Sequence, residues 1–87
     1  MTFVQLEYIL AIDTHRHFAR AADACFVTQP TLSMQVQKLE ESLGVKIFDR
    51  SRSPVIPTEA GKEILEQARK ILLEKSRISE IISRRKG

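Results

Sequence analysis

The sequence predicts an all-α fold that carries one small β-hairpin and ends in a long helix. Apolar residues recur at helical spacing over most of the 87 residues. Two short β-leaning runs, residues 45–50 and 55–57, flank a polar turn, which is typical of a hairpin. Helical spacing then continues from Glu59 to about Arg85. This last helix would span about 40 Å at about 1.5 Å per residue, which is more than so small a domain can cover.

The first two helices are expected in the N-terminal part of the chain. Thr2 and Gln5 match a capping box, and the first helix should end near Asp13–His15. The second helix is expected from about Phe18 to Cys25. It is rich in alanine, which favours helix and lets two helices approach closely.

A short turn leads into the third helix, expected over Gln29–Leu43. Thr28 is a good N-cap residue, Pro30 is tolerated in the first turn, and Gly44 suits the position just past the helix. The face that we expect to be buried comprises Leu32, Val36, Leu39 and Leu43.

We expect the chain to consist of two parts. Residues 1–58 form a domain that ends with the hairpin, and residues 59–87 form a linker and dimerisation helix. Pro54 and Pro57 forbid a long central strand, so the hairpin should be small. A seam with coiled-coil-like spacing follows, interrupted once by Lys75. The expected dimerisation residues are Ile64, Ala68, Ile71, Leu72, Ile78 and Ile82.

Bulk composition bounds the function without deciding it. The net charge of +3 and the pI of about 9.4 fit a polyanionic partner weakly. An aromatic share of 6% without tryptophan offers few platforms for stacking single-stranded bases. No apolar run suits a membrane span, no signal peptide opens the chain, and its single cysteine cannot form an internal disulfide. We therefore expect a cytoplasmic protein with no membrane partner; the polar helical end suggests a longer parent protein.

The polar start of the third helix predicts contact with DNA bases. A tight connection between an Ala-rich helix and a helix with a polar leading turn is typical of a helix-turn-helix, which inserts that leading turn into the major groove. Capping accounts for Thr28 alone. It does not account for the further polar side chains of the leading turn, which are Gln29, Thr31, Ser33 and Gln35. Glutamine can pair with adenine, and a threonine methyl group can pack on thymine.

Three arginines outside that helix are further candidates. Arg52, on the hairpin turn, can enter a narrow minor groove, although a solvated turn charge is the alternative. For Arg50, beside Phe48, a structural or phosphate-binding role competes evenly with base reading. Arg20 lies on the helix that crosses the DNA backbone in this motif, so a phosphate contact and no contact are equally open.

Several linked motifs resemble the N-terminal domain of LysR-type transcriptional regulators. They are Phe18-x-x-Ala21-Ala22, Val27-Thr28-Gln29-Pro30-Thr31-Leu32-Ser33, Leu39-Glu40, Leu43-Gly44, Ile47-Phe48-x-Arg50 and Thr58-Glu59-Ala60-Gly61. The stretches from His15 to Phe18, from Ala22 to Cys25 and from Gln29 to Ser33 are most similar to the peroxide-sensing OxyR branch. The resemblance implies a winged helix-turn-helix activator, a dimerising linker helix, an effector domain beyond this chain, and a tetramer in the full-length protein.

The combined DNA-binding assignment includes Met34, at a groove-facing position that the resemblance marks as varying with the operator. The expected DNA-binding residues are Thr28, Gln29, Pro30, Thr31, Ser33, Met34, Gln37, Arg20, Arg50, Arg52 and Thr58. The partner is expected to be double-stranded DNA with a pseudo-palindromic operator.

Other functions fit the sequence less well. Cys25 replaces a leucine common in the family; we expect it to pack in the core, with redox sensing as the alternative. His15 and His17 have no ligand cluster around them, so we expect no metal and no cofactor. The sequence holds no nucleophile–base pair, which argues against an enzyme. The remaining alternatives are a LysR-type regulator of another small-molecule response, and a coiled-coil interaction module built on the long helix.

Overall fold

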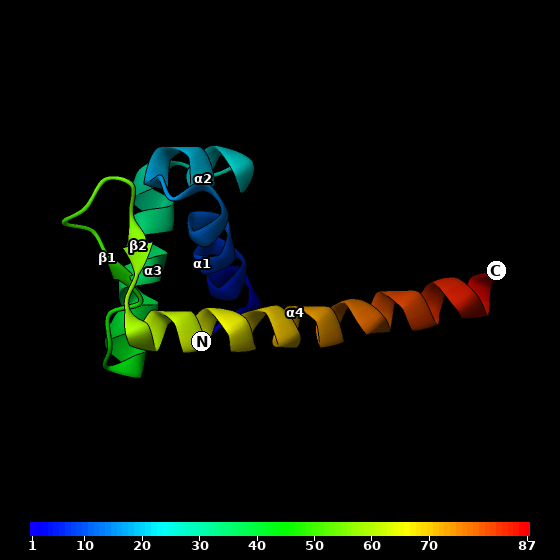
Figure 1. Ribbon diagram of the computed structural model, residues 1–87. Helices are drawn as coiled ribbons and strands as arrows, with labels where there is room; N and C mark the ends of the chain where they lie inside the picture. Colours follow the sequence, from blue (N-terminus) through cyan, green and yellow to red (C-terminus); the bar gives the residue numbers. More distant parts are fainter.

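The computed structural model describes residues 1–87 and contains four helices and one hairpin (Figure 1). The elements are α1 (Phe3–His15), α2 (Phe18–Ala24), α3 (Gln29–Leu43), β1 (Phe48–Asp49), β2 (Ile56–Pro57) and α4 (Glu59–Lys86). The predicted fold class is therefore confirmed. The helix bounds also agree, except that α2 stops one residue before Cys25 and α4 continues one residue past Arg85.

Local side-chain chemistry explains where the helices begin. Thr2 and Gln5 form the expected capping box, in which each side chain accepts from the other residue's backbone N–H. The Thr28 hydroxyl accepts from the N–H of Thr31 at 3.3 Å and so fixes the start of α3. Gly44 ends α3 with φ at 75°, a left-handed conformation that glycine adopts without a steric penalty.

The hairpin is smaller than its two β-leaning runs suggest, because each strand has two residues. Phe48 pairs with Pro57, and Asp49 pairs with Ile56, in antiparallel register. Val45 lies outside the strand and is exposed. Proline cannot donate to a ladder, which limits how far the pairing extends.

A single apolar core lies where α1, α2, α3, the hairpin and the first half of α4 meet. Its buried apolar residues are Leu6, Tyr8, Ile9, Ile12, Ala21, Ala22, Leu32, Val36, Leu39, Ile47, Phe48, Val55, Leu65 and Ala68. This core presents α3 with one face buried and the other face open to solvent. None of the four helices combines the length and the apolar character that a membrane span requires.

The last helix, α4, has two different halves. Its first half lies along the base of the other elements, and its second half projects beyond them to the C-terminus (Figure 1). The molecule is consequently elongated, with principal extents of 49, 25 and 20 Å. Every residue of α4 from Leu73 onward is exposed. We call residues 59–72 the packed half and residues 73–86 the free half.

The predicted dimerisation seam needs a correction, because it runs across both halves. Ala68 is only 1% exposed and belongs to the core, so its assignment to a dimer surface is wrong. The seam residues that are half-buried and pack against the same core are Ile64, Ile71 and Leu72. Ile78 and Ile82 are 66% and 47% exposed, and both lie in the free half. Helical periodicity shows that a face is apolar, but it does not show whether the chain itself or a partner covers that face.

Candidate nucleic-acid interface

The leading turn of α3 is open to solvent, as a DNA-reading surface requires. It lies beside α2, at the end of α3 farthest from α4 (Figure 1). The exposed candidates on this surface are Thr28, Gln29, Pro30, Thr31, Met34 and Gln37, and Ser33 is half-buried. The opposite face of α3 is held in the core by Leu32, Val36 and Leu39. A helix fixed in this way can present its polar turn without rearranging.

Gln35 was expected among these polar side chains, and that expectation is wrong. Its side-chain carbonyl oxygen accepts from Nε2 of Gln5 at 3.2 Å, and its side chain is half-buried. Gln5 is itself buried in α1. Gln35 therefore ties α3 to α1 and faces away from the open surface.

Arg50 makes three contacts within the protein. Its Nη1 donates to the Ser33 hydroxyl at 3.0 Å, and its Nη2 lies 3.6 Å from a carboxylate oxygen of Glu40. The guanidinium also sits over the ring of Phe18, 4.5 Å from the ring centroid. These contacts favour the structural role over the other roles left open by the sequence, and they join the hairpin to both α2 and α3.

Glu40 is a structural residue beside this surface whose role the sequence did not predict. Its side chain is 3% exposed, and its Oε2 accepts from the N–H of Ile47 at 2.7 Å and of Phe48 at 3.4 Å. Since a buried carboxylate requires such partners, Glu40 anchors the start of the hairpin. One signal was available: Glu40 lies four residues after Val36, on the apolar face of the helix.

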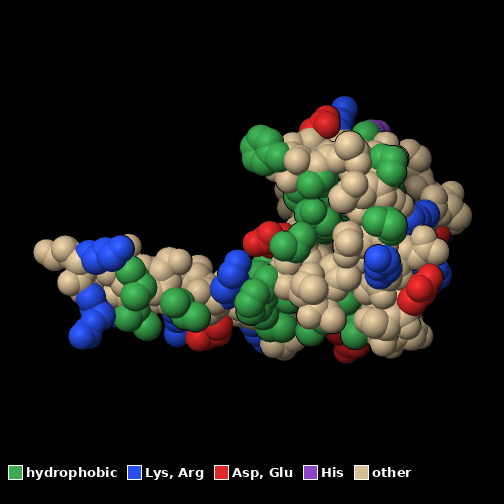
Figure 2. Space-filling view, turned by 180° about the vertical axis from the view of Figure 1, so that it is seen from behind, with side chains coloured by type: hydrophobic (Ala, Val, Ile, Leu, Met, Phe, Trp, Pro, Cys, Tyr) green, Lys and Arg blue, Asp and Glu red, His purple; other side chains and the backbone are tan.

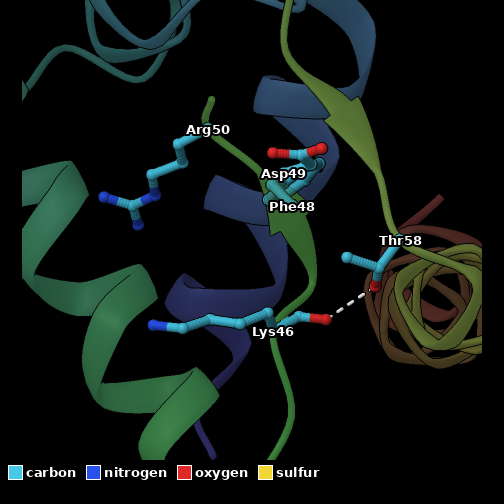
Figure 3. Close-up of a pocket in the computed structure, with 5 residues that line it drawn as sticks. All are labelled: Lys46, Phe48, Asp49, Arg50 and Thr58. Carbon is cyan, nitrogen blue, oxygen red and sulfur yellow. Dashed lines mark hydrogen bonds between the residues drawn. The ribbon is translucent and has the colours of Figure 1, made fainter. Parts of the chain in front are cut away.

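A hollow of about 450 Å³ lies at the base of the hairpin, lined by Lys46, Phe48, Asp49, Arg50 and Thr58 (Figure 3). Lys46 and Arg50 both extend toward α3. The Thr58 hydroxyl donates to the carbonyl of Lys46 at 2.6 Å and accepts from the N–H of Gly61 at 2.9 Å. Thr58 thus caps α4 and also fixes the segment that leads into β1.

The other two arginines point into solvent. Arg52 is 68% exposed and lies 3.6 Å from a carboxylate oxygen of Asp49. Hydrogen bonds from Ser51 lower the pKa of Asp49, and the charge of Arg52 lowers it further. The Arg20 side chain is exposed, and its backbone N–H donates to Nδ1 of His17 at 3.2 Å. Both guanidinium groups are accessible to a phosphate.

Cys25 is less buried than the sequence suggested. It follows the last residue of α2, is half-buried, and packs against the edge of the core. Partial burial, and secondarily the negative charge of Glu7, raise the pKa of its thiol. A raised pKa lowers the thiolate fraction and hence the reactivity toward oxidants.

In two curated relatives, nearly half of the aligned residues are identical to those of this chain. A hydrogen peroxide-inducible genes activator of Pectobacterium carotovorum subsp. carotovorum is 48% identical over 83 residues, which cover 95% of this chain and 28% of that protein. The DNA-binding transcriptional dual regulator OxyR of Escherichia coli K12 is 47% identical, with 95% and 27% covered. The chain thus spans little more than a quarter of these relatives.

Solved structures agree in fold. A full-length OxyR variant from Pseudomonas aeruginosa superposes with a TM-score of 0.90 at 47% identity, covering 95% of this chain and 28% of that one. The BenM DNA-binding domain bound to benA site 1 DNA gives 0.92 at 33% identity, covering 97% and 94%. The CbnR DNA-binding domain bound to DNA gives 0.90 at 36% identity, covering both chains completely.

Residues 3–62, from the start of α1 into α4, match the family model for bacterial regulatory helix-turn-helix proteins of the lysR family. The matched region includes the whole exposed turn of α3 and the hairpin. This chain belongs to the LysR family of bacterial regulatory helix-turn-helix proteins.

Proposed function

We propose that this chain is the sequence-specific, double-stranded-DNA-binding part of a LysR-type transcriptional regulator that responds to hydrogen peroxide as an activator. The observation that carries DNA binding is the exposed polar turn of α3, held rigid by the core beneath it. BenM and CbnR, which share this fold at 33% and 36% identity, are solved with DNA. The peroxide response rests on the relatives named as peroxide-inducible activators. On this proposal the chain acts in the bacterial cytoplasm and catalyses no reaction.

Two grooves would be contacted by different elements. Gln29, in the first turn of α3, would meet base edges in the major groove, where a glutamine side chain can bind adenine through two hydrogen bonds. Arg52, on the exposed hairpin turn, would enter the flanking minor groove. Arg20 would contact a phosphate beside these grooves, since phosphate contacts set register without reading sequence. Thr58, expected among the DNA-binding residues, is not proposed as a contact, because its one hydroxyl proton is donated to the Lys46 carbonyl.

The proposed regulator is a homodimer, joined through the free half of α4 and reading a pseudo-palindromic operator. Apolar side chains gather along that half, with Lys and Arg near its end (Figure 2). The large exposed apolar residues there are Leu73, Ile78, Ile81 and Ile82. A larger assembly, a tetramer, is proposed for the full-length regulator.

The experiment compares Gln29→Ala with Arg52→Ala on a duplex selected from a random pool. Gln29→Ala should cost about 1–3 kcal/mol of binding free energy on the selected site and relax preference at one base position. Arg52→Ala should weaken binding to all duplexes, lower the salt slope by about one unit per protomer, and blunt preference for an A·T-rich flank.

The two changes should be nearly additive, because the side chains would address different grooves. Titrations at several salt concentrations, on matched and base-substituted duplexes, measure both effects. If Gln29→Ala weakens every duplex equally, the assignment of Gln29 to base reading is wrong. If the unaltered chain shows no preference among duplexes, the proposed function itself fails.

A further inference from the structure

The Ser33 hydroxyl is bonded differently from those of three other helical residues. Thr14, Ser42 and Ser76 each donate their hydroxyl proton to a backbone carbonyl three or four residues earlier. Ser33 makes no such bond; its hydroxyl oxygen instead accepts from Nη1 of Arg50 at 3.0 Å. A hydroxyl group has one proton to donate and two lone pairs, so this bond occupies one lone pair and leaves the proton and the second lone pair unused.

The partner of Ser33 can act only as a donor. A guanidinium group has five N–H donors, no acceptor, and a charge that persists at every physiological pH. Arg50 is held in place by the Glu40 carboxylate at 3.6 Å and by the Phe18 ring at 4.5 Å. Glu40 is itself buried and bonded to two backbone N–H groups of the hairpin. The direction of the Arg50–Ser33 bond is therefore set before DNA arrives.

We propose that Arg50 is a positioning residue that makes Ser33 a hydrogen-bond donor toward DNA and so biases one position of the operator half-site. A donor hydroxyl in the major groove suits the acceptors N7 of purines, O6 of guanine and O4 of thymine. It gains less from cytosine, whose N4 amino group is itself a donor and would have to bond to the oxygen that already accepts from the positively charged Arg50. Ser33 therefore discriminates against cytosine at the base it meets. The inference rests on the proposed DNA-binding function and adds the chemistry of one contact.

The test is a double-mutant cycle read out on single base substitutions. On the selected duplex, each base of a half-site is changed in turn to cytosine, and affinities are measured for Ser33→Ala, Arg50→Met and the double variant. Ser33→Ala should relax discrimination against cytosine at one position by about tenfold. Arg50→Met should relax it at the same position by a similar factor. The double variant should lose no further discrimination there.

Arg52→Met is the matched control. It removes the same charge from the same hairpin, but Arg52 pairs with Asp49 and does not touch Ser33. This variant should weaken binding to all duplexes and leave discrimination at the Ser33 position intact. A purely electrostatic role for Arg50 predicts that Arg50→Met behaves in the same way as Arg52→Met. That outcome would overturn the inference.

Arg50→Lys guards against loss of folding, since Arg50→Met leaves the Glu40 carboxylate without its counter-charge. Lysine keeps the charge but lacks the planar fork that reaches two partners, so discrimination should still relax. Thermal melting checks that each variant is folded. Unchanged discrimination in both Ser33→Ala and Arg50→Lys would overturn the inference. If the unaltered chain prefers no duplex, both the proposed function and this inference fail. If it prefers a duplex but the variants keep their discrimination, only this inference fails.

Discussion

Phe26 adopts a left-handed backbone conformation, which residues with a Cβ rarely adopt. It lies in the turn between α2 and α3, its φ is 60°, and it is 94% exposed. A left-handed conformation costs a residue with a Cβ roughly 1–2 kcal/mol, and asparagine tolerates it better. The turn nevertheless forms, because the backbone N–H groups of Phe26 and Val27 donate to the last carbonyls of α2.

Phe26→Asn should therefore raise the free energy of unfolding by about 1 kcal/mol, because it relieves this backbone penalty. Urea denaturation measures the change. Phe26→Ala is the control, since alanine removes the exposed ring but lacks the short polar side chain that lets asparagine adopt a left-handed conformation, and it should give little gain. A loss of stability in Phe26→Asn would show that the ring makes a contact that the fold needs.

Cys25 is expected to have a structural role rather than a sensing role. Cys25→Ser should lower the free energy of unfolding by about 1 kcal/mol, because a hydroxyl is partly buried in place of a thiol, and should leave DNA affinity nearly unchanged. The raised thiol pKa also predicts slower alkylation at neutral pH than that of a free cysteine. A reversible peroxide-driven change in affinity that Cys25→Ser abolishes would establish sensing instead.

At the scale of the secondary-structure elements, the hairpin and α4 meet in a close contact at Gly61. A Cβ added at Gly61 would lie 1.9 Å from the carbonyl oxygen of Ile47, so no side chain fits there without moving the backbone. Glycine lets α4 start directly against the segment that leads into β1.

Gly61→Ala should lower the free energy of unfolding by about 1–3 kcal/mol, because overpacking forces the hairpin and α4 apart. Chemical denaturation measures this loss. Glu63→Ala, at an exposed position of the same helix, should change stability little. Equal effects of the two substitutions would show that the junction is free to relax.

The elements also show where sequence reasoning succeeds and where it stops. The bounds of α3 could be predicted, because Thr28 and Gly44 act through local backbone chemistry that is visible in the sequence. The role of Glu40 could not, because its partners in the hairpin are brought to it by folding. The exposure of the leading turn could be predicted. The position of the Gln35 side chain could not, because folding brings Gln5 to it from a distant part of the sequence.

At the scale of the whole molecule, the free half of α4 carries large apolar side chains that the rest of the chain leaves uncovered. Ile78→Asp plus Ile82→Asp should convert the proposed dimer to monomers without unfolding the protein, because both side chains are exposed. Light scattering measures the mass. Ser79→Asp plus Ser83→Asp adds the same charges at exposed polar positions and should leave the dimer intact. Wild-type chains that stay monomeric at high micromolar concentration would refute dimerisation.

The close approach at Gly61 has a consequence for distance. Because α4 sits directly against the backbone that leads into the hairpin, it has little room to change its angle there. In the proposed dimer, the distance between the two copies of α3 is therefore fixed. A dimer of this kind selects operators by the spacing between their half-sites as well as by their base sequence. Successive turns of DNA lie about 34–36 Å apart, so five extra base pairs between half-sites would move the second one to the far side of the duplex. Ten extra base pairs would return the second half-site to the same side of the duplex, but would place it too far along the DNA for the second copy of α3 to reach.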